Sequence, residues 1–171
     1  AVGPQPRNAE GYAAARARAE EEIAAIQGIV GESDNKVVLA RSPDDLYAAQ
    51  AEGKGALILG FQNALILGEE VAYLDQLYDA GIRVFALTHM GHNDFADSSR
   101  PLFIAEQGAH EPASEHGGLS DLGRAALRRI NELGGMVDVS QLSREATLEV
   151  AARSAVPVIA SHSNVRALTD V

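Results

Sequence analysis

Apolar residues recur along the chain with two spacings, which indicate helices alternating with strands. Residues 8–30 carry Ile23, Ile26 and Val30 at helical spacing in a segment rich in Ala, Glu and Arg. Short continuous apolar runs, typical of buried strands, lie between the helical segments; the run 55–61 is expected to be buried on both faces. We predict helices over residues 8–30, 42–53, 69–80, 120–133 and 143–153, and strands over residues 36–40, 55–61, 82–87, 136–139 and 156–160.

Helix-length connections between these strands require a parallel sheet with right-handed crossovers, which is the α/β class. The residues at helix ends agree: Ser42 and Pro43 suit a helix start, and Gly81 suits a helix end. Five strands fit either a doubly wound open sheet or part of a barrel, because a complete eight-stranded barrel needs about 200 residues or more. No glycine-rich phosphate loop follows any strand, which disfavours a nucleotide-binding protein.

The connection over residues 88–118 is too long for an ordinary turn. It contains Pro, Gly, Ser and Asn and four of the five histidines. A loop of that length without secondary structure is usually functional or mobile. We therefore predict a functional or mobile loop between two strands of the sheet.

Composition narrows the class of function. The net charge is −10 and the arginines are scattered, so a nucleic-acid partner is not expected, because phosphate binding needs clustered basic residues. No apolar run approaches the roughly 20 residues that span a bilayer, and no signal-peptide pattern opens the chain, whose first residues resemble the middle of a longer protein or a processed end. Cysteine is absent, so a zinc site would need histidine and carboxylate ligands.

Polar residues follow four of the predicted strands at their carboxyl ends. In parallel α/β folds these ends face the active site, so their side chains are expected to converge. The four polar pairs are Gln62-Asn63, Thr88-His89, Ser140-Gln141 and Ser161-His162.

Ordered motifs from Asp34 to the C-terminus resemble the membrane (renal) dipeptidase family of zinc peptidases, in the amidohydrolase-type barrel group. The motifs are Gly60-Phe61-Gln62-Asn63, residues 77–84 (LYDAGIRV), Leu87-Thr88-His89 with Asn93, Ala96-Asp97-Ser98, Gly118-Leu119-Ser120, Leu122-Gly123, Asn131-Glu132-Leu133-Gly134, Val137-Asp138-Val139-Ser140 and residues 157–163 (PVIASHS). Motifs in order over such a span are more specific than one short pattern. The resemblance implies a TIM-type α/β barrel, of which residues 1–171 would be an incomplete middle portion forming a single partial domain.

The resemblance also implies two zinc ions at the barrel mouth that activate a water to attack a dipeptide amide. By position, Gln62 stands where the family has a bridging glutamate and Gln141 where it has a zinc-binding histidine. His162 matches the second zinc histidine, and His89 matches a histidine that contacts the substrate. The family's first-strand His-x-Asp ligands would precede this segment, and its late aspartate and substrate-binding arginine would follow it, in the remainder of the barrel.

A neutral amide is a poor substitute for either ligand, since it lacks the negative charge of a carboxylate and the ring nitrogen of imidazole. We therefore hypothesise a hydrolytic centre that is degraded or reassigned, with one zinc ion or none remaining. Without the resemblance, Gln62 would more simply cap the next segment, and His89 would be a hydrogen-bonded buried histidine. The pair His92 and Asp94 imitates a His-x-Asp motif, but its place in the long loop is wrong for the family's ligands.

Three classes of function follow from the resemblance. The first is a metal-dependent dipeptidase acting on a small peptide. The second is a non-hydrolytic relative in the maturation of a secreted peptide natural product; the motif Gly60-Phe61-Gln62-Asn63 favours the branch associated with a pyoverdine-type siderophore. The third is a peptide-binding protein without catalysis. The family resemblance implies a periplasmic or exported protein, and the sequence leaves the oligomeric state open, a homo-oligomer included.

Overall fold

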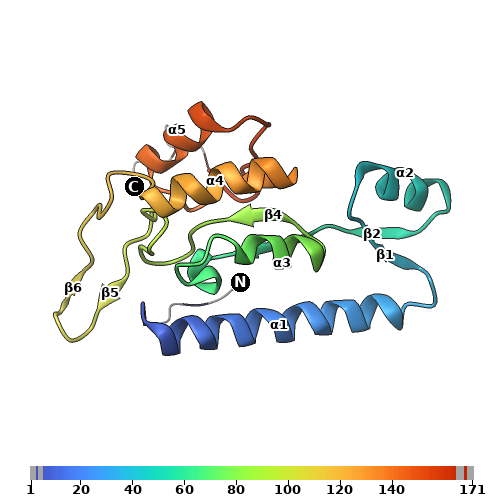
Figure 1. The fold of residues 1–171 in the computed structure, drawn as a ribbon, viewed down its shortest axis with the longest axis horizontal. Coiled ribbons are helices and arrows are strands. Elements are labelled where there is room, and N and C mark those ends of the chain that lie inside the picture. The colour runs from blue at the N-terminus through green and yellow to red at the C-terminus, as the bar shows by residue number, and fades with distance from the viewer. Residues whose placement is uncertain (1–2, 4–5, 165–167, 169–171) are drawn as a thin grey trace.

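The α/β class is confirmed by the computed structural model, which describes Gly3, residues 6–164 and Leu168. The helices are α1 (Ala9–Gly31), α2 (Pro43–Ala51), α3 (Tyr73–Asp79), α4 (Asp121–Leu133) and α5 (Arg144–Arg153), with a 3₁₀ turn η1 (Ala64–Leu67). The strands are β1 (Val37–Leu39), β2 (Gly55–Leu57), β3 (Leu59–Gln62), β4 (Ile82–Ala86), β5 (Phe103–Ile104), β6 (Ala109–His110) and β7 (Met136–Asp138). Figure 1 shows α1 along one side of the molecule, α4 and α5 on the opposite side, and α2 with β1 and β2 at one end.

The parallel strands follow one another in chain order. β1 pairs with β2, and β3 pairs with β4, which pairs with β7, all in parallel. The predicted strand 156–160 is reduced to a single parallel bridge between Ile159 and Asp138, which adds a further position beyond β7. Within the described residues the sheet is open, so the barrel predicted from the sequence is not closed here.

The predicted strand 55–61 divides at Ile58, because its first half pairs with β1 and its second half pairs with β4. The prediction that it is buried on both faces is wrong: Leu57 and Ile58 are 38% and 47% exposed. Both residues are therefore only partly covered by the described part of the chain.

Local sequence accounts for the helix ends. Ser42 forms a capping box with Asp45 at the start of α2, and the Ser120 hydroxyl accepts the Gly123 N–H at the start of α4. Gly134 ends α4 in the left-handed conformation. Helix α3 is shorter than the predicted 69–80, because residues 69–72 form turns before it.

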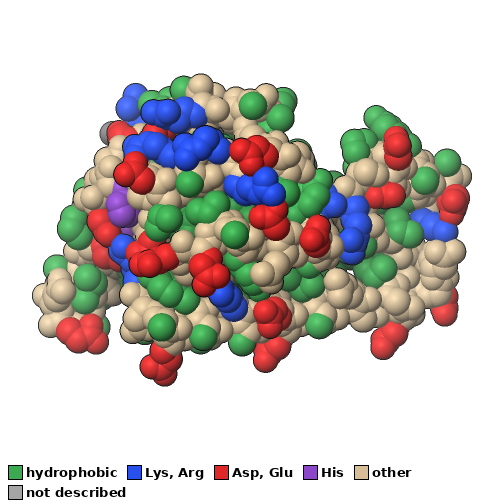
Figure 2. Space-filling model, viewed as in Figure 1, with side chains coloured by type: hydrophobic (Ala, Val, Ile, Leu, Met, Phe, Trp, Pro, Cys, Tyr) green, Lys and Arg blue, Asp and Glu red, His purple; other side chains and the backbone are tan. Residues whose placement is uncertain are grey.

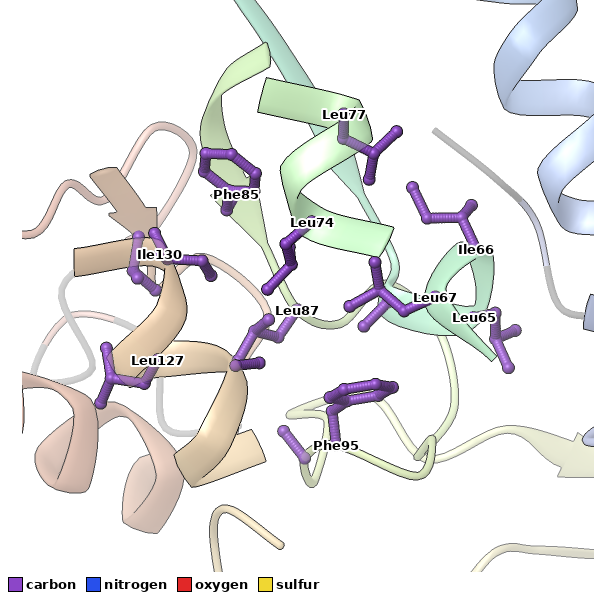
Figure 3. Close-up of a cluster of buried hydrophobic side chains, with 14 of the residues drawn as sticks. Leu65, Ile66, Leu67, Leu74, Leu77, Phe85, Leu87, Phe95, Leu127 and Ile130 are labelled. Carbon is purple, nitrogen blue, oxygen red and sulfur yellow. The ribbon is translucent and has the colours of Figure 1, made fainter. Parts of the chain in front are cut away.

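The main hydrophobic core lies between the sheet and its helices (Figure 3). Phe85 from β4 is fully buried, as are Leu74 from α3 and Ile130 from α4. Phe95, from the connection over residues 88–118, is also fully buried in this core. The long connection is therefore anchored to the core of the domain.

The same connection is not structureless. It contains the antiparallel hairpin β5–β6, in which the rings of Phe103 and His110 meet edge to face at a centroid distance of 5.2 Å. Figure 1 shows this hairpin projecting from the end of the molecule opposite α2. Ala96 also forms a bridge with Leu119, so the prediction of a loop without secondary structure is corrected.

Acidic side chains outnumber basic ones, and several of the basic ones form ion pairs on the surface. Figure 2 shows acidic side chains spread over one face and a row of basic side chains over α4 and α5. Arg124 in α4 forms ion pairs with Asp121 and with Glu149 of α5, and so ties these two helices together. In the part of the chain that the structure describes, no helix has the length and apolar character needed to cross a membrane.

Candidate functional site

Three side chains from separate strand ends meet at the carboxyl edge of the sheet. Gln62 is the last residue of β3, Gln141 follows β7, and His162 follows the bridge at Ile159. The amide nitrogen Nε2 of Gln62 donates to Oε1 of Gln141. Nε2 of His162 lies 3.1 Å from Nε2 of Gln62 and 3.3 Å from Oε1 of Gln141. Parallel strand topology thus brings together residues that are up to 100 positions apart.

The backbone at Gln141 is held in an unusual conformation. Its φ is 65°, in the left-handed region that non-glycine residues seldom adopt. The hydroxyl of Thr88 donates to the carbonyl oxygen of Gln141 at 2.8 Å, and Oγ of Ser98 lies 3.3 Å from the same oxygen. Strained conformations that surrounding contacts enforce tend to occur at functional sites, so this geometry supports a functional role for the cluster.

His162 is joined to the sheet through a buried carboxylate. Asp138, at the end of β7, accepts the Ser161 hydroxyl, and Ser161 Oγ lies 2.7 Å from Nδ1 of His162. The His162 N–H donates to the hydroxyl of Ser140 at 3.0 Å. Burial alone would raise the pKa of Asp138, but the hydrogen bonds from Ser161 and Ser140 outweigh it and lower that pKa below its ordinary value. Asp138 therefore has a hydrogen-bonding role, accepting from Ser140 and Ser161.

His89 lies two residues beyond Leu87, after the end of β4. Its carbonyl oxygen accepts the Ser98 hydroxyl at 2.6 Å, while its ring nitrogen Nδ1 is buried without a hydrogen-bond partner among the described residues. Burial lowers the pKa of His89 below its ordinary value, and the nearby positive charge of Arg100 adds to this effect. A neutral ring with an unpaired buried nitrogen is suited to contact a ligand. No hydrogen bond joins it to the cluster within the described structure.

The donors at this site do not fit a two-zinc centre. Gln62, Gln141 and His162 offer two neutral amides and one imidazole, whereas zinc sites use imidazole, thiolate and carboxylate ligands. Residues 6–164 contain no group of three or more His, Cys, Asp or Glu side chains that could hold a metal ion. The two amides are also engaged with each other.

The long connection is organised by Asp97, a residue that sequence reasoning placed in a motif without assigning it a role. Its fully buried carboxylate accepts the Ser114 hydroxyl and the backbone N–H groups of Glu115, His116 and Gly118. Burial by itself would raise the pKa of Asp97, but these hydrogen bonds outweigh it and lower the pKa to about 2. Asp97 therefore fixes the far end of the connection beside Ser98, which contacts both His89 and Gln141.

His92 is a structural residue of the same connection. Its side chain is fully buried; Nδ1 accepts the Ser98 N–H at 3.0 Å, and Nε2 lies 2.7 Å from the carbonyl oxygen of Pro112. Asp94 instead pairs with Arg7 at 2.9 Å and accepts the Tyr12 hydroxyl at 2.8 Å. These contacts agree with the interpretation that the His92-x-Asp94 pair is not a metal motif.

Acid should remove the contribution of Asp97 to stability. Because its folded pKa of about 2 lies below the ordinary 3.8, this contribution is complete above pH 4 and disappears as the pH falls through 2. The shift corresponds to on the order of 2 kcal/mol. We expect D97N to lower the free energy of unfolding at pH 7, and the gap from wild type to narrow between pH 4 and pH 2. Urea unfolding across this pH range measures the difference in free energy of unfolding between each variant and wild type, and D79N, at the exposed Asp79, is the control. A difference for D97N that stays constant from pH 4 to pH 2 would contradict the lowered pKa of Asp97.

Comparison with known proteins finds matches that carry the name dipeptidase. The family described as "Membrane dipeptidase (Peptidase family M19)" matches residues 4–171. The crystal structure of the probable dipeptidase PvdM from Pseudomonas aeruginosa is 39% identical with a TM-score of 0.88, and the match covers 98% of this chain and 41% of that one. Dipeptidase verJ from Clonostachys rogersoniana is 28% identical over 150 residues, which are 88% of this chain and 36% of the relative.

A third comparison concerns the fold alone. A metallo peptidase from Rhodobacter sphaeroides, crystallised with a phosphinate mimic of the dipeptide L-Ala-D-Ala, is 22% identical with a TM-score of 0.81. The match covers 92% of this chain and 43% of that one. The chain thus spans about two fifths of the solved structures that it resembles and about a third of its curated relative.

Proposed function

Because the chain belongs to the membrane dipeptidase family, peptidase family M19, we propose that it binds a dipeptide or peptide-like compound at the carboxyl ends of its parallel strands. The observation that carries this proposal is the mutual contact of Gln62, Gln141 and His162 at that edge. Active sites of parallel α/β barrels lie at this edge, and the unpaired Nδ1 of His89 supplies a further polar group near it.

In the whole protein this chain would form the middle portion of a TIM-type barrel. The parallel order of β3, β4 and β7 and the match to about two fifths of PvdM support it. Closing the barrel would also cover Leu57 and Ile58, which are otherwise exposed apolar side chains on an open strand.

Gln62 and Gln141 are proposed to stand at altered metal-ligand positions. Their amides offer hydrogen-bond donors and acceptors that suit the amide and carboxylate groups of a peptide. They do not offer the charge needed to hold two divalent cations, so hydrolysis through a two-zinc centre is not part of the proposal. A mimic of L-Ala-D-Ala bound to the Rhodobacter sphaeroides relative supports a dipeptide-sized ligand.

A non-hydrolytic role in the maturation of a secreted, siderophore-type peptide is the second candidate. The siderophore-type branch is favoured by 39% identity to PvdM, against 22% for the Rhodobacter sphaeroides metallo peptidase, and the absence of hydrolysis is argued from Gln62 and Gln141. A periplasmic location would accompany this role. The second candidate requires the bound compound to be chemically changed, whereas the third, peptide binding without catalysis, leaves it unchanged.

Metal content is the first test of the proposed site. The full-length protein, purified without chelators or added zinc, is expected to contain almost no zinc by elemental mass spectrometry and to leave dipeptides intact. About two metal ions per chain together with dipeptide turnover would contradict the proposal, because Gln62 and Gln141 would then be tolerated in a working two-metal centre.

A further inference from the structure

The two ring nitrogens of His162 have different neighbours. Nδ1 lies 2.7 Å from the hydroxyl oxygen of Ser161, whereas Nε2 faces the amide groups of Gln62 and Gln141 at 3.1 and 3.3 Å. A neutral histidine carries one proton, and the nitrogen that holds it is set by what the neighbours donate and accept. Which neighbouring groups can donate a hydrogen bond and which can only accept one therefore determines which ring nitrogen is left as an acceptor.

Asp138 determines where the single proton of the Ser161 hydroxyl goes. Its Oδ1 accepts the backbone N–H groups of Ser140 at 2.9 Å and Ser161 at 3.2 Å. Its Oδ2 accepts the Ser161 hydroxyl. A carboxylate has no proton to give, so Ser161 is the donor in that contact and has only lone pairs left for His162. The reverse arrangement would set lone pairs of Asp138 and Ser161 against each other at close range.

We infer that Asp138 and Ser161 are positioning residues that hold His162 as the Nδ1-protonated tautomer, with the lone pair of Nε2 directed at the amide N–H of Gln62. The amide of Gln62 has two hydrogens, one for Oε1 of Gln141 and one for Nε2 of His162. Every donor in this chain of hydrogen bonds then has an acceptor, and Oε1 of Gln141, 3.3 Å from Nε2 of His162, accepts from Gln62 and not from the ring. Hydrogen-bond partners behind a functional histidine commonly fix its tautomer in this way.

The inference deepens the proposed function, on which it rests for the identity of the ligand. An acceptor nitrogen at the edge of the sheet suits an N–H or O–H group of a peptide-like compound, which would take the place of the Gln62 hydrogen. The His162 backbone N–H donates to the Ser140 hydroxyl at 3.0 Å, which holds the backbone of His162 next to the residue that precedes Gln141.

The tautomer is measurable directly by long-range proton–nitrogen correlation NMR. The full-length protein is labelled with ¹⁵N-histidine and dialysed against a chelator, so that no bound metal fixes the ring, and the His162 signals are identified by their loss in H162Q. At pH 8, where an ordinary histidine is neutral, the wild type is expected to show the Nδ1-protonated pattern.

Two variants separate positioning from mere structural support. D138N keeps the shape of Asp138 but lets its amide donate to Ser161, whose hydroxyl proton then turns to Nδ1, so His162 is expected to shift to the Nε2-protonated tautomer. S161A removes the link and is expected to give a mixture of both tautomers. Ser163 flanks His162 on the other side and contacts the Ser140 hydroxyl at 3.3 Å, so S163A is the matched control and should leave the tautomer unchanged.

A wild type with the Nε2-protonated pattern would overturn the inference, as would a folded D138N with an unchanged tautomer. If D138N does not fold, S161A decides: a mixture supports the inference and an unchanged tautomer overturns it. The readout needs neither metal nor substrate. Two metal ions per chain in the untreated protein would therefore contradict the proposed function without affecting this result.

Discussion

Replacing Gln62 by glutamate and Gln141 by histidine in the full-length protein is expected to raise its zinc affinity by roughly four orders of magnitude. The double variant Q62E/Q141H would place one carboxylate and two imidazoles, including His162, where side chains are already in contact. Four-ligand structural zinc sites are worth about 10–16 kcal/mol, which is about 3 kcal/mol per ligand. Each restored ligand then contributes on the order of 100-fold in affinity.

The matched control moves the same substitutions to the surface. Gln50 in α2 and Gln76 in α3 are both exposed, so Q50E/Q76H has the same composition and net charge as the site variant. Zinc titration followed calorimetrically, with elemental analysis after dialysis, compares the two proteins. Equal zinc affinity in the site and control variants would show that Gln62 and Gln141 do not stand at ligand positions.

The bounds of α4 follow from its sequence alone because the signals that set them are local. The hydroxyl of Ser120 caps one end and Gly134 takes the left-handed conformation at the other, each within a few residues of the helix. The division of residues 55–61 at Ile58 depends instead on strand neighbours from elsewhere in the chain, and a local apolar run carries no information about them. The predicted strand 156–160 likewise depends on its neighbours, and here it keeps one bridge to Asp138.

The meeting of the side chains at the site could be predicted from strand order, whereas their individual hydrogen bonds could not. Parallel topology alone brings Gln62, Gln141 and His162 to one edge of the sheet, so their contact follows from the order of strands and helices. The link from Asp138 to Ser161 depends on the register of residues 138 and 159, which no local pattern specifies. The metal-ligand roles inferred from family resemblance stay predictions until zinc is measured.

The role of Asp97 could not be predicted from the sequence either. Its partners Ser114, Glu115, His116 and Gly118 lie 17 to 21 residues further along the chain. A segment rich in glycine and serine is expected to be mobile, but one buried carboxylate with several donors organises it, and Phe95 anchors it in the core. The signal available in the sequence was the Ala96-Asp97-Ser98 motif, which the resemblance singled out without giving a physical reason for it.

Gly123 belongs to the Leu122-Gly123 motif, and its replacement is expected to lower the stability of the protein substantially. It lies in the first turn of α4, where a Cβ would meet the carbonyl oxygen of Phe95 at 2.0 Å. This oxygen also accepts the Ser120 N–H at 2.9 Å, so backbone on both sides of the contact is already held. G123A should therefore push the Phe95 segment away from α4 and lower the free energy of unfolding by about 3 kcal/mol or more.

Gly28 in α1 offers the opposite result from the same substitution. A Cβ there has no atom within 4 Å, so G28A gains helix propensity without a clash and should stabilise the protein by roughly 0.5–1 kcal/mol. Urea unfolding followed by circular dichroism compares both variants of the full-length protein with wild type. G123A should destabilise the protein and G28A should stabilise it. Alanine is favoured over glycine in both helices, but of these two sites only Gly123 has a backbone atom in the way of a Cβ. A stability of G123A equal to that of G28A would mean that α4 and the Phe95 segment are not packed as tightly as this contact requires.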